Sequence, residues 1–235
     1  MPPASSPARD LLQNLPGAVQ RGSALAERCR EERFHPTGDA VLDAGIGGGL
    51  PVGRCHEIYG GLSSGVTSLS LRMLAERTRR GHCVAWVEVA DALDPASCRA
   101  HGVRLEQLLW VRAQGRAQAL RAAEAILSAA GFALVVLDLR PGSGRQGRER
   151  VPAAARWVRL SRMAAGRRSS LLLLPGATPL LRGVPAAVRL RLQEGRARRA
   201  EGTPLVLEGI CTRAWVERAP AGARATGRSL PLVLS

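Results

Sequence analysis

"EIYGGLSSGVTSLSLRML", residues 57–74, reads as a strand, a glycine-bounded loop and a helix. Gly60 and Gly65 enclose four residues and are followed by Val66 and Thr67, which is the spacing of a phosphate-binding P-loop. In such a loop, backbone N–H groups and the helix N-terminus bind phosphate, a lysine after the second glycine adds positive charge, and a Ser or Thr binds Mg²⁺. Val66 stands at the lysine position. The stretch therefore predicts a phosphate cradle that keeps its backbone and hydroxyl but lacks its cation.

This loop supplies most of the candidate nucleotide-binding residues. No neighbouring arginine obviously replaces the lysine, because Arg72 lies more than one turn into the helix. A purely structural role also remains open, in which the glycines only let the strand and the helix pack closely. The predicted phosphate-binding residues of the loop are Gly60, Ser63, Ser64, Gly65, Val66, Thr67 and Ser68.

Strands and helices alternate along the middle of the chain, and the strands are almost continuously apolar. This pattern predicts an α/β fold with a mainly parallel sheet covered by helices on both faces. After residue 185 the pattern changes, and "VRLRL", "TPLVLEGI" and "CTRAWVER" predict antiparallel edge strands. The expected inner strands are 55–59, 83–89, 108–111, 133–138 and 170–175, and the expected helices are 65–80, 94–102, 116–130 and 152–166.

The chain has 235 residues, is 46% hydrophobic and carries a formal net charge of +15, with every basic residue an arginine. Such a basic excess indicates an anionic partner, most often nucleic acid, although a coding bias toward arginine would give the same excess. The five cysteines form no C-x-x-C pair, which argues against zinc and against a disulfide framework. No apolar run has the length of a membrane span, and no signal peptide is recognisable. These features predict a cytoplasmic protein that does not contact a membrane.

Four segments together resemble the RecA recombinase family. "LDAGIGGGLPVGRCHEIYGGLSSGVTSLSLRML" is similar to the ATP-binding opening of RecA, and "VAWVEVADALDP" to the strand that carries the catalytic glutamate. "ALVVLDLR" resembles the Walker B strand, and "VRLRLQEGRARR…GICTRAWVERAP" the strands that close the core. The resemblance implies a RecA-like P-loop core. It also implies that Asp94 lies on the adenine side of a nucleotide, and that Thr67 and Asp138 hold Mg²⁺ if a nucleotide binds.

The departures from the RecA pattern argue against a recombinase. The catalytic lysine position is Val66, and the catalytic glutamate position falls on Ala90, beside Asp91. Pro175 and Gly176 replace the Asn-Gln sensor, and the second DNA-binding loop is reduced to "GATPLLRGVPA". The resemblance therefore implies no certain cofactor, with ATP and Mg²⁺ as the candidates.

The short length, "AVQRGSALA", the "PTG..VLDAGIGGGLPVG" turn and the basic C-terminal tail are similar to the ImuA family. This resemblance implies a non-catalytic accessory protein of SOS-induced translesion DNA synthesis. Its expected partners are RecA, ImuB, an error-prone polymerase and single-stranded DNA, and its expected location is cytoplasmic and nucleoid-associated. Two alternatives stay open: a weak DNA-dependent ATPase of the RecA family that uses Asp91 or a neighbouring subunit, and a general DNA-binding accessory factor.

Arginines cluster where RecA has its DNA-binding loops. Arg156 and Arg159, with Arg162, recur at three-residue spacing along one helical face, which suits phosphate contacts but is equally expected of a solvated face. The predicted DNA-binding residues are Arg145, Arg148, Arg150, Arg156, Arg159 and Arg182. The further arginines of "GRARRAEG" are interpreted as a solvated hairpin tip.

Three segments are expected along the chain. Residues 1–36 form a partly disordered helical extension, residues 37–219 the RecA-like core, and residues 220–235 a basic tail. Trp215 is interpreted either as an exposed partner contact on an edge strand or as a half-buried sheet residue. The four histidines lack metal-ligand spacing and are interpreted as structural.

Overall fold

The computed structural model describes residues 33–142, 154–180, 186–200 and 203–234. Its centre is a nine-stranded sheet with the strand order β11-β10-β8-β3-β7-β6-β4-β5, in which β9 pairs with β10 off this path. The strands from β8 to β5 run parallel to one another. They are β8 (Ala186–Leu192), β3 (Cys55–Gly60), β7 (Ser170–Leu174), β6 (Phe132–Asp138), β4 (Cys83–Glu88) and β5 (Leu108–Arg112).

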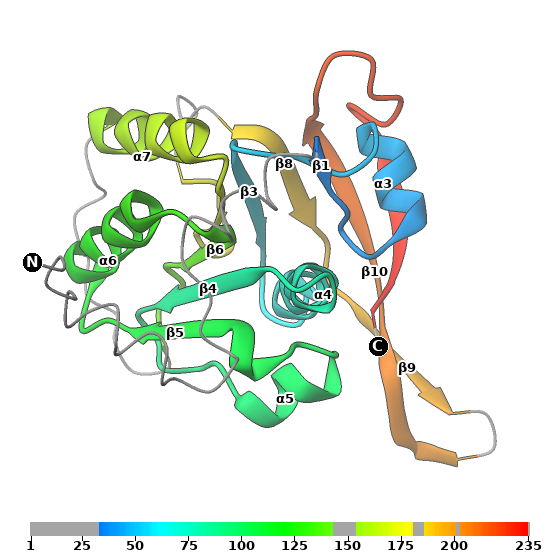
Figure 1. Cartoon of the computed structure of the whole chain (residues 1–235). Helices are drawn as coiled ribbons and strands as arrows, with labels where there is room; N and C mark the ends of the chain where they lie inside the picture. Colours follow the sequence, from blue (N-terminus) through cyan, green and yellow to red (C-terminus); the bar gives the residue numbers. More distant parts are fainter. Residues whose placement is uncertain (1–32, 143–153, 181–185, 201–202, 235) are drawn as a thin grey trace, which may run out of the picture.

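Helices cover both faces of the parallel strands, as the apolar strand sequences predict (Figure 1). On one face lie α6 (Arg116–Ala129) and α7 (Ala154–Arg167), which pack against each other. The other face carries α4 (Val66–Arg79), and α3 (Ala40–Ile46) packs against β11. The short helix α5 (Pro95–Ala100) and the 3₁₀ turn η1 (Leu105–Gln107) connect β4 to β5. A separate two-stranded ribbon joins β1 (Phe34–His35) to β2 (Leu50–Pro51).

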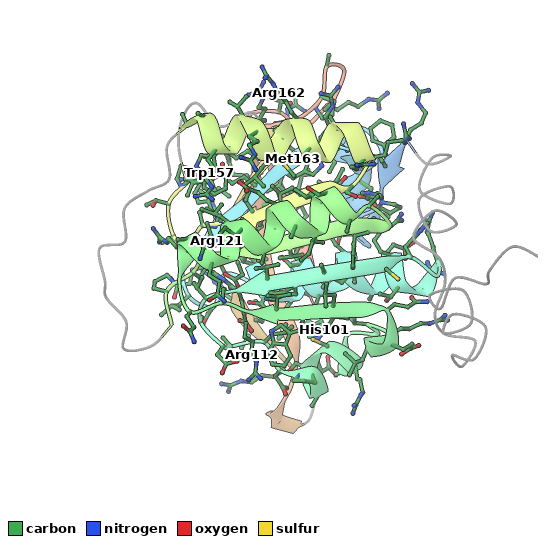
Figure 2. The ribbon with its side chains drawn as sticks, turned by 60° about the vertical axis from the view of Figure 1, so that its left-hand side comes forward. His101, Arg112, Arg121, Trp157, Arg162 and Met163 are labelled. Carbon is green, nitrogen blue, oxygen red and sulfur yellow. The ribbon has the colours of Figure 1, made fainter. Side chains whose placement is uncertain are left out.

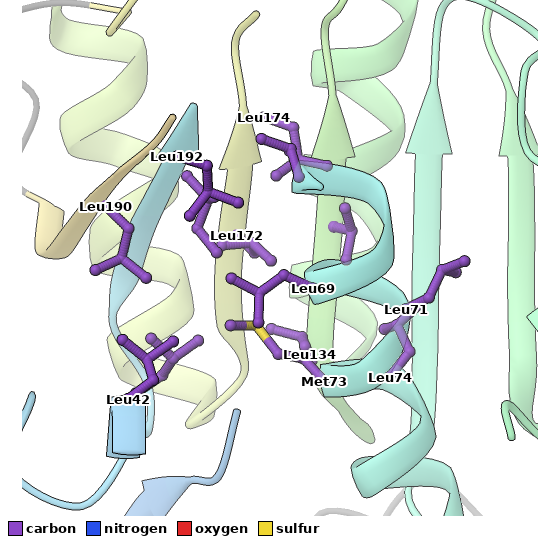
Figure 3. Packing of buried hydrophobic residues seen from close by; sticks show 14 of the residues in the cluster. Leu42, Leu69, Leu71, Met73, Leu74, Leu134, Leu172, Leu174, Leu190 and Leu192 are labelled. Carbon is purple, nitrogen blue, oxygen red and sulfur yellow. The ribbon is translucent and has the colours of Figure 1, made fainter. Parts of the chain in front are cut away.

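The α4 face forms one of two apolar cores. Leu69 and Met73 are one helical turn apart, so both side chains point at the sheet and meet Leu134 and Leu172 (Figure 3). All four side chains are at most 1% exposed. This packing fixes α4 over β3, β7 and β6, and therefore fixes the loop that precedes α4.

The α6 and α7 face forms the second core. Trp157 and Leu160 of α7 and Leu120 of α6 are fully buried against alternate side chains of β4, β6 and β7. Arg162 and Met163 lie on the same helix as Trp157, and Arg162 is exposed to solvent (Figure 2). The two cores explain why β7, β6 and β4 are almost continuously apolar, since these strands bury both of their faces.

Strand β8 corrects one sequence-based expectation. "VRLRL" predicts an antiparallel edge strand, but β8 is an inner strand that pairs in parallel with β3 and antiparallel with β10. Its alternation has a different cause. Val188, Leu190 and Leu192 are buried in the α4 core, whereas Arg189 and Arg191 point to the face that no described helix covers at this end of the sheet. The polar alternation thus corresponds to a face that no helix of the described residues covers.

The C-terminal strands also differ from expectation. "TPLVLEGI" and "CTRAWVER" form one continuous strand, β10 (Thr203–Arg218), which extends beyond the body of the protein together with β9 (Arg196–Ala200) (Figure 1). The expected basic tail contains an ordered edge strand, β11 (Ser229–Leu234), which pairs antiparallel with β10. The alternating apolar residues Leu232 and Leu234 explain this, because both are buried in the α4 core.

His56 on β3 provides a pH-dependent test of this packing. Its ring is fully buried and contacts the carbonyl oxygen of Pro51 through Nε2 at 3.0 Å. Burial lowers the pKa of His56 from 6.5 to about 3, although the Pro51 hydrogen bond opposes the shift. Below pH 6.5 His56 is protonated in the unfolded chain, whereas in the folded chain it stays neutral down to about pH 3. The free energy of unfolding should therefore fall by about 1.4 kcal/mol per pH unit over this window because of His56 alone.

Urea unfolding between pH 7 and pH 5 measures this effect. The variant His56→Gln has no group that titrates at this position, so its stability should fall less steeply with pH than that of the wild type. Equal slopes for the two proteins would contradict the buried, neutral state of His56.

Candidate phosphate-binding site

The carboxyl ends of the parallel strands converge on one pocket of about 660 Å³. The β3–α4 loop forms its floor, the segments that follow β6 and β7 form its walls, and Ile210 of β10 closes one side. Open α/β sheets bind ligands at this edge because loops from several strands meet there. All seven loop residues predicted from the sequence to bind phosphate line the pocket: Gly60, Ser63, Ser64, Gly65, Val66, Thr67 and Ser68.

Two glycines shape the loop for steric reasons. Gly65 caps α4 with φ of 87°, a left-handed conformation that side chains disfavour. A Cβ on Gly60 would lie 2.8 Å from the carbonyl oxygen of Leu192 and 2.5 Å from Ser64 Oγ. Gly60 N–H also donates to Gly176 O at 2.9 Å, which ties the loop to the end of β7. The loop conformation is therefore set by neighbouring strands as well as by its own sequence.

Val66, at the position of the P-loop lysine, is buried. Its side chain is 4% exposed and belongs to the α4 core, so it contributes apolar packing and no charge to the pocket. Leu62 at the tip of the loop differs from Val66 in its exposure, since this apolar side chain is 95% exposed. The cradle is thus a backbone structure whose own side chains are apolar or hydroxylic.

The pocket contains the positive charge of Arg140, a residue that the sequence analysis did not identify. Arg140, two residues beyond the end of β6, donates from Nη1 to Thr67 Oγ1 at 2.9 Å. It also donates to both carboxylate oxygens of Asp138, from Nε at 2.9 Å and from Nη2 at 2.6 Å. The sequence analysis looked for a cation near the loop only in the helix that follows it, and so did not consider Arg140. The available signal was "DLRP", an arginine two residues after the strand-ending aspartate.

The electrostatics of this cluster favour the ion pair. Asp138 is 2% exposed, and the side chain of Arg140 is 27% exposed. Burial alone would lower the pKa of Arg140, but hydrogen bonds and charge from Asp138 outweigh it, and the charge of Glu88 adds to them, so the pKa is raised. Arg140 is therefore a permanent positive charge bound to the β6 carboxylate.

A neighbouring pocket of about 490 Å³ contains the positions that resemble the catalytic strand of RecA. Ala90 and Asp91 line it together with Arg112, and Gly142 is shared with the phosphate-loop pocket. Asp91 adopts a left-handed conformation with φ of 52°, and its carboxylate lies 3.5 Å from Arg112 Nη1. Both side chains are more than 60% exposed, so this ion pair is a surface contact. Within the described part of the chain, Asp91 lines this smaller pocket and not the larger one.

Glu88, the last residue of β4, holds the loop that carries Ala90 and Asp91. Its carboxylate is 1% exposed and accepts hydrogen bonds from the backbone N–H of Ala92 and Leu93 and from Trp110 Nε1 at 2.7 Å. The sequence analysis did not single it out, because an acid in an apolar strand has no spacing signature. These contacts make Glu88 a structural residue of the loop.

The predicted adenine-side residue, Asp94, caps α5. Its carboxylate accepts hydrogen bonds from the N–H groups of Ala96 and Ser97 and from Ser97 Oγ. These bonds, the Ser97 hydroxyl first, lower the pKa of Asp94. Asp94 is exposed and is not among the residues described as lining the phosphate-loop pocket. Its capping role accounts for the contacts that the structure gives it.

The predicted DNA-binding arginines fall into two groups. Arg156 and Arg159 on α7 both lie against Glu124 of α6, at 3.2 and 3.0 Å. One carboxylate thus offsets part of their charge, while Arg162 on the same helix is exposed (Figure 2). The remaining four candidates lie outside the described residues: Arg145, Arg148, Arg150 and Arg182.

Strands β8, β10 and β9 carry a further group of arginines, on faces over which the described residues place no helix. Trp215 lies half-buried on β10, which is an inner strand, and the guanidinium of Arg191 lies 6.0 Å from its ring centroid. Arg213 is exposed next to this pair and donates to Ser229. On β9, Arg198 pairs with Glu208 at 3.2 Å, so the expected solvated hairpin tip is an exposed strand.

Comparison with known proteins gives the family. A model of the RecA N-terminal domain matches residues 21–142, just over half of the chain. The chain belongs to the RecA N-terminal domain family. Protein RecA of Prochlorococcus marinus (strain MIT 9303) is 42% identical over 113 residues, which are 48% of this chain and 30% of that protein. Protein RecA of Methylococcus capsulatus is 41% identical over 123 residues, 52% of this chain and 35% of that protein.

These alignments span about a third of the curated RecA relatives. A crystal structure of the RadB recombinase covers more of the RecA-like chain, namely 86% of it and 96% of RadB, with a TM-score of 0.64 and 19% identity. That likeness shows the fold. It confirms the predicted RecA-like α/β architecture with a mostly parallel sheet, flanking helices and antiparallel strands.

The described histidines show no metal-binding arrangement. His35 and His56 are buried, and His101 Nδ1 contacts the carbonyl oxygen of Ser97. Within the described ranges, no group of three His, Cys, Asp or Glu side chains is arranged to hold a metal ion. Likewise, none of the helices described is both long and apolar enough to cross a membrane.

Proposed function

We propose that this RecA-family chain is a non-catalytic accessory protein of SOS-induced translesion DNA synthesis, as the resemblance to ImuA implies. It would act through contacts with RecA, with ImuB and an error-prone polymerase, and with single-stranded DNA. One observation carries the non-catalytic part. The P-loop is present as a backbone cradle, but Val66 is buried apolar packing where the lysine would stand.

The strand that resembles the catalytic strand of RecA supports the same reading. Ala90 has no carboxylate to activate a water molecule, and Glu88 is occupied by three hydrogen-bond donors. Asp91 lines the neighbouring pocket and contacts Arg112. In phosphoryl transfer, a positioned base and cations next to the phosphates supply most of the rate enhancement. A chain without the positioned base and the P-loop lysine is expected to use its RecA-like shape as a binding surface.

The proposed contacts with DNA and partner proteins rest on charge. The formal net charge stays at +15 after all 19 acidic residues are subtracted from the 34 arginines. The Arg191–Trp215 face has no helix over it among the described elements. Phosphates or acidic side chains complement such a face. The candidates Arg145, Arg148, Arg150 and Arg182 belong to the same proposal.

A phosphate-release assay with ATP and Mg²⁺, with and without single-stranded DNA, tests the non-catalytic part. We expect no turnover above that of a Gly65→Asp control, in which a Cβ at a φ of 87° and 2.5 Å from Leu234 Cδ1 distorts the cradle. Turnover that DNA stimulates and that Gly65→Asp abolishes would instead identify a weak DNA-dependent ATPase.

The biological part needs a separate readout. Loss of the protein from its host should lower the frequency of damage-induced mutations, and a Gly65→Asp variant that folds should restore it. Unchanged mutation frequencies after loss of the protein would contradict a role in translesion synthesis. A further measurement is co-purification from damaged cells. Recovery of RecA and ImuB with the protein would favour an accessory factor of repair over a general DNA-binding protein.

A further inference from the structure

The residues implied to hold Mg²⁺ are engaged by a side chain of the protein itself. The resemblance to RecA implies Mg²⁺ on Thr67 and Asp138. In this structure, Thr67 Oγ1 and both carboxylate oxygens of Asp138 accept hydrogen bonds from Arg140. The Arg140 backbone N–H adds a fourth contact, to Asp138 Oδ1 at 3.0 Å. These ligand atoms therefore do not fit a metal ion in the arrangement observed.

We propose that the Arg140 guanidinium occupies the place of the divalent cation, so that this chain binds no metal between Thr67 and Asp138. The two-pronged contact of a guanidinium with a carboxylate is among the stronger hydrogen-bonded ion pairs. Because Asp138 is almost fully buried, few water molecules compete for it. A metal ion would have to break this pair and remain beside a permanent positive charge.

The local chain geometry holds Arg140 in this position. Arg140 follows Asp138 by two residues, and Pro141 comes next and restricts the backbone. Leu139 lies between Asp138 and Arg140 and is 1% exposed. Its N–H donates to the carbonyl oxygen of Leu174 on β7. The backbone on both sides of the arginine is therefore fixed, so that holding the side chain on Asp138 costs little further backbone entropy.

The substitution at the lysine position is compatible with this arrangement. A lysine at residue 66 would start from the N-terminus of α4, one residue from Thr67, and would place a second cation in the same pocket. With Val66, the positive charge comes from the β6 side only. Of the five N–H groups of the guanidinium, Asp138 and Thr67 take three, so two remain for a ligand. A phosphate that enters the pocket would meet this arginine without a bridging metal.

Paramagnetic broadening by Mn²⁺, a substitute for Mg²⁺, tests the proposal in the full chain. The readout is the set of backbone amide signals of Thr67, Ser68 and Leu139 in nuclear magnetic resonance spectra. We expect these signals to stay sharp in the wild type and to broaden in Arg140→Ala, which uncovers Thr67 and Asp138. In Arg140→Ala combined with Asp138→Asn the broadening should disappear.

Two results would overturn the proposal. If the wild type broadens as strongly as Arg140→Ala, the arginine moves aside for the metal. If neither broadens, Arg140 is not what excludes the cation. Should Arg140→Ala fail to fold, the Nε–H signal of Arg140 in the wild type decides the question. A slowly exchanging signal that added Mg²⁺ leaves unchanged supports the proposal, and a saturable shift of that signal with Mg²⁺ contradicts it.

Discussion

Replacing Glu57 with alanine is expected to lower the free energy of unfolding by about 3–5 kcal/mol. Glu57 lies on β3, the strand that leads into the phosphate loop, and its side chain is fully buried. One carboxylate oxygen accepts the Nε–H of Arg189 on β8, and the other accepts the backbone N–H of Leu180 at 2.6 Å. The residue thus connects β3 to β8 and to the segment that follows β7.

The cost is large because alanine removes a charge without removing its partners. The guanidinium of Arg189 is mostly buried and would lose this carboxylate, and Leu180 N–H would lose its acceptor. Unfolding by urea, followed by circular dichroism, measures the loss.

Glu217→Ala is the matched control for Glu57→Ala. Glu217 is an acid on β10 that accepts the hydroxyl hydrogen bond of Tyr59 on β3, but it is exposed. Its removal should cost only about 1 kcal/mol. Similar losses for the two variants would mean that the buried ion pair does not stabilise the junction of β3 and β8.

The second large effect is expected for Glu88→Ala, at about 3 kcal/mol. The variant leaves the N–H groups of Ala92 and Leu93 and the indole N–H of Trp110 without the carboxylate that binds all three. Ala92 and Leu93 lie in the loop between β4 and α5, and Trp110 holds Glu88 from β5. That loop should therefore open before the rest of the sheet does. Hydrogen exchange at Ala92 and Leu93 should accelerate more than exchange in β6.

Asp91→Asn is the matched control for Glu88→Ala. Asp91 is an acid in the same loop, but its ion pair with Arg112 is exposed, and asparagine tolerates its left-handed backbone. The expected loss is at most about 1 kcal/mol. If Asp91→Asn were the more damaging of the two, the loop would depend on the surface ion pair and not on Glu88.

The strength of the local signals explains how much of the fold was predictable. The inner strands and helices were predicted within a few residues because each apolar strand is bounded by glycine, proline or a charged residue. For example, the strand expected at 55–59 is β3, Cys55–Gly60, and the helix expected at 65–80 is α4, Val66–Arg79. The phosphate loop was predictable for the same reason, since its two glycines and Thr67 are neighbours in sequence.

Other features could not be predicted from local patterns. The alternation of apolar and charged residues in "VRLRL" is the same for an edge strand and for an inner strand with one face open to solvent. The local pattern therefore could not decide whether β8 lies at the edge of the sheet or inside it. The segment after Pro220 has the composition of a tail, and only the burial of Leu232 and Leu234 against α3 and α4 makes β11 part of the sheet.

The sequence by itself determined the family, the succession of strands and helices along the chain, and the absence of the P-loop lysine. Each of these depends on residues that are neighbours in the sequence. Only the tertiary structure showed that Arg140 lies on Thr67, 73 residues away along the chain. It also showed that Glu88 and Glu57 are structural acids. A charged side chain takes its role from the partners that the fold brings to it, and in a buried site those partners come from different strands.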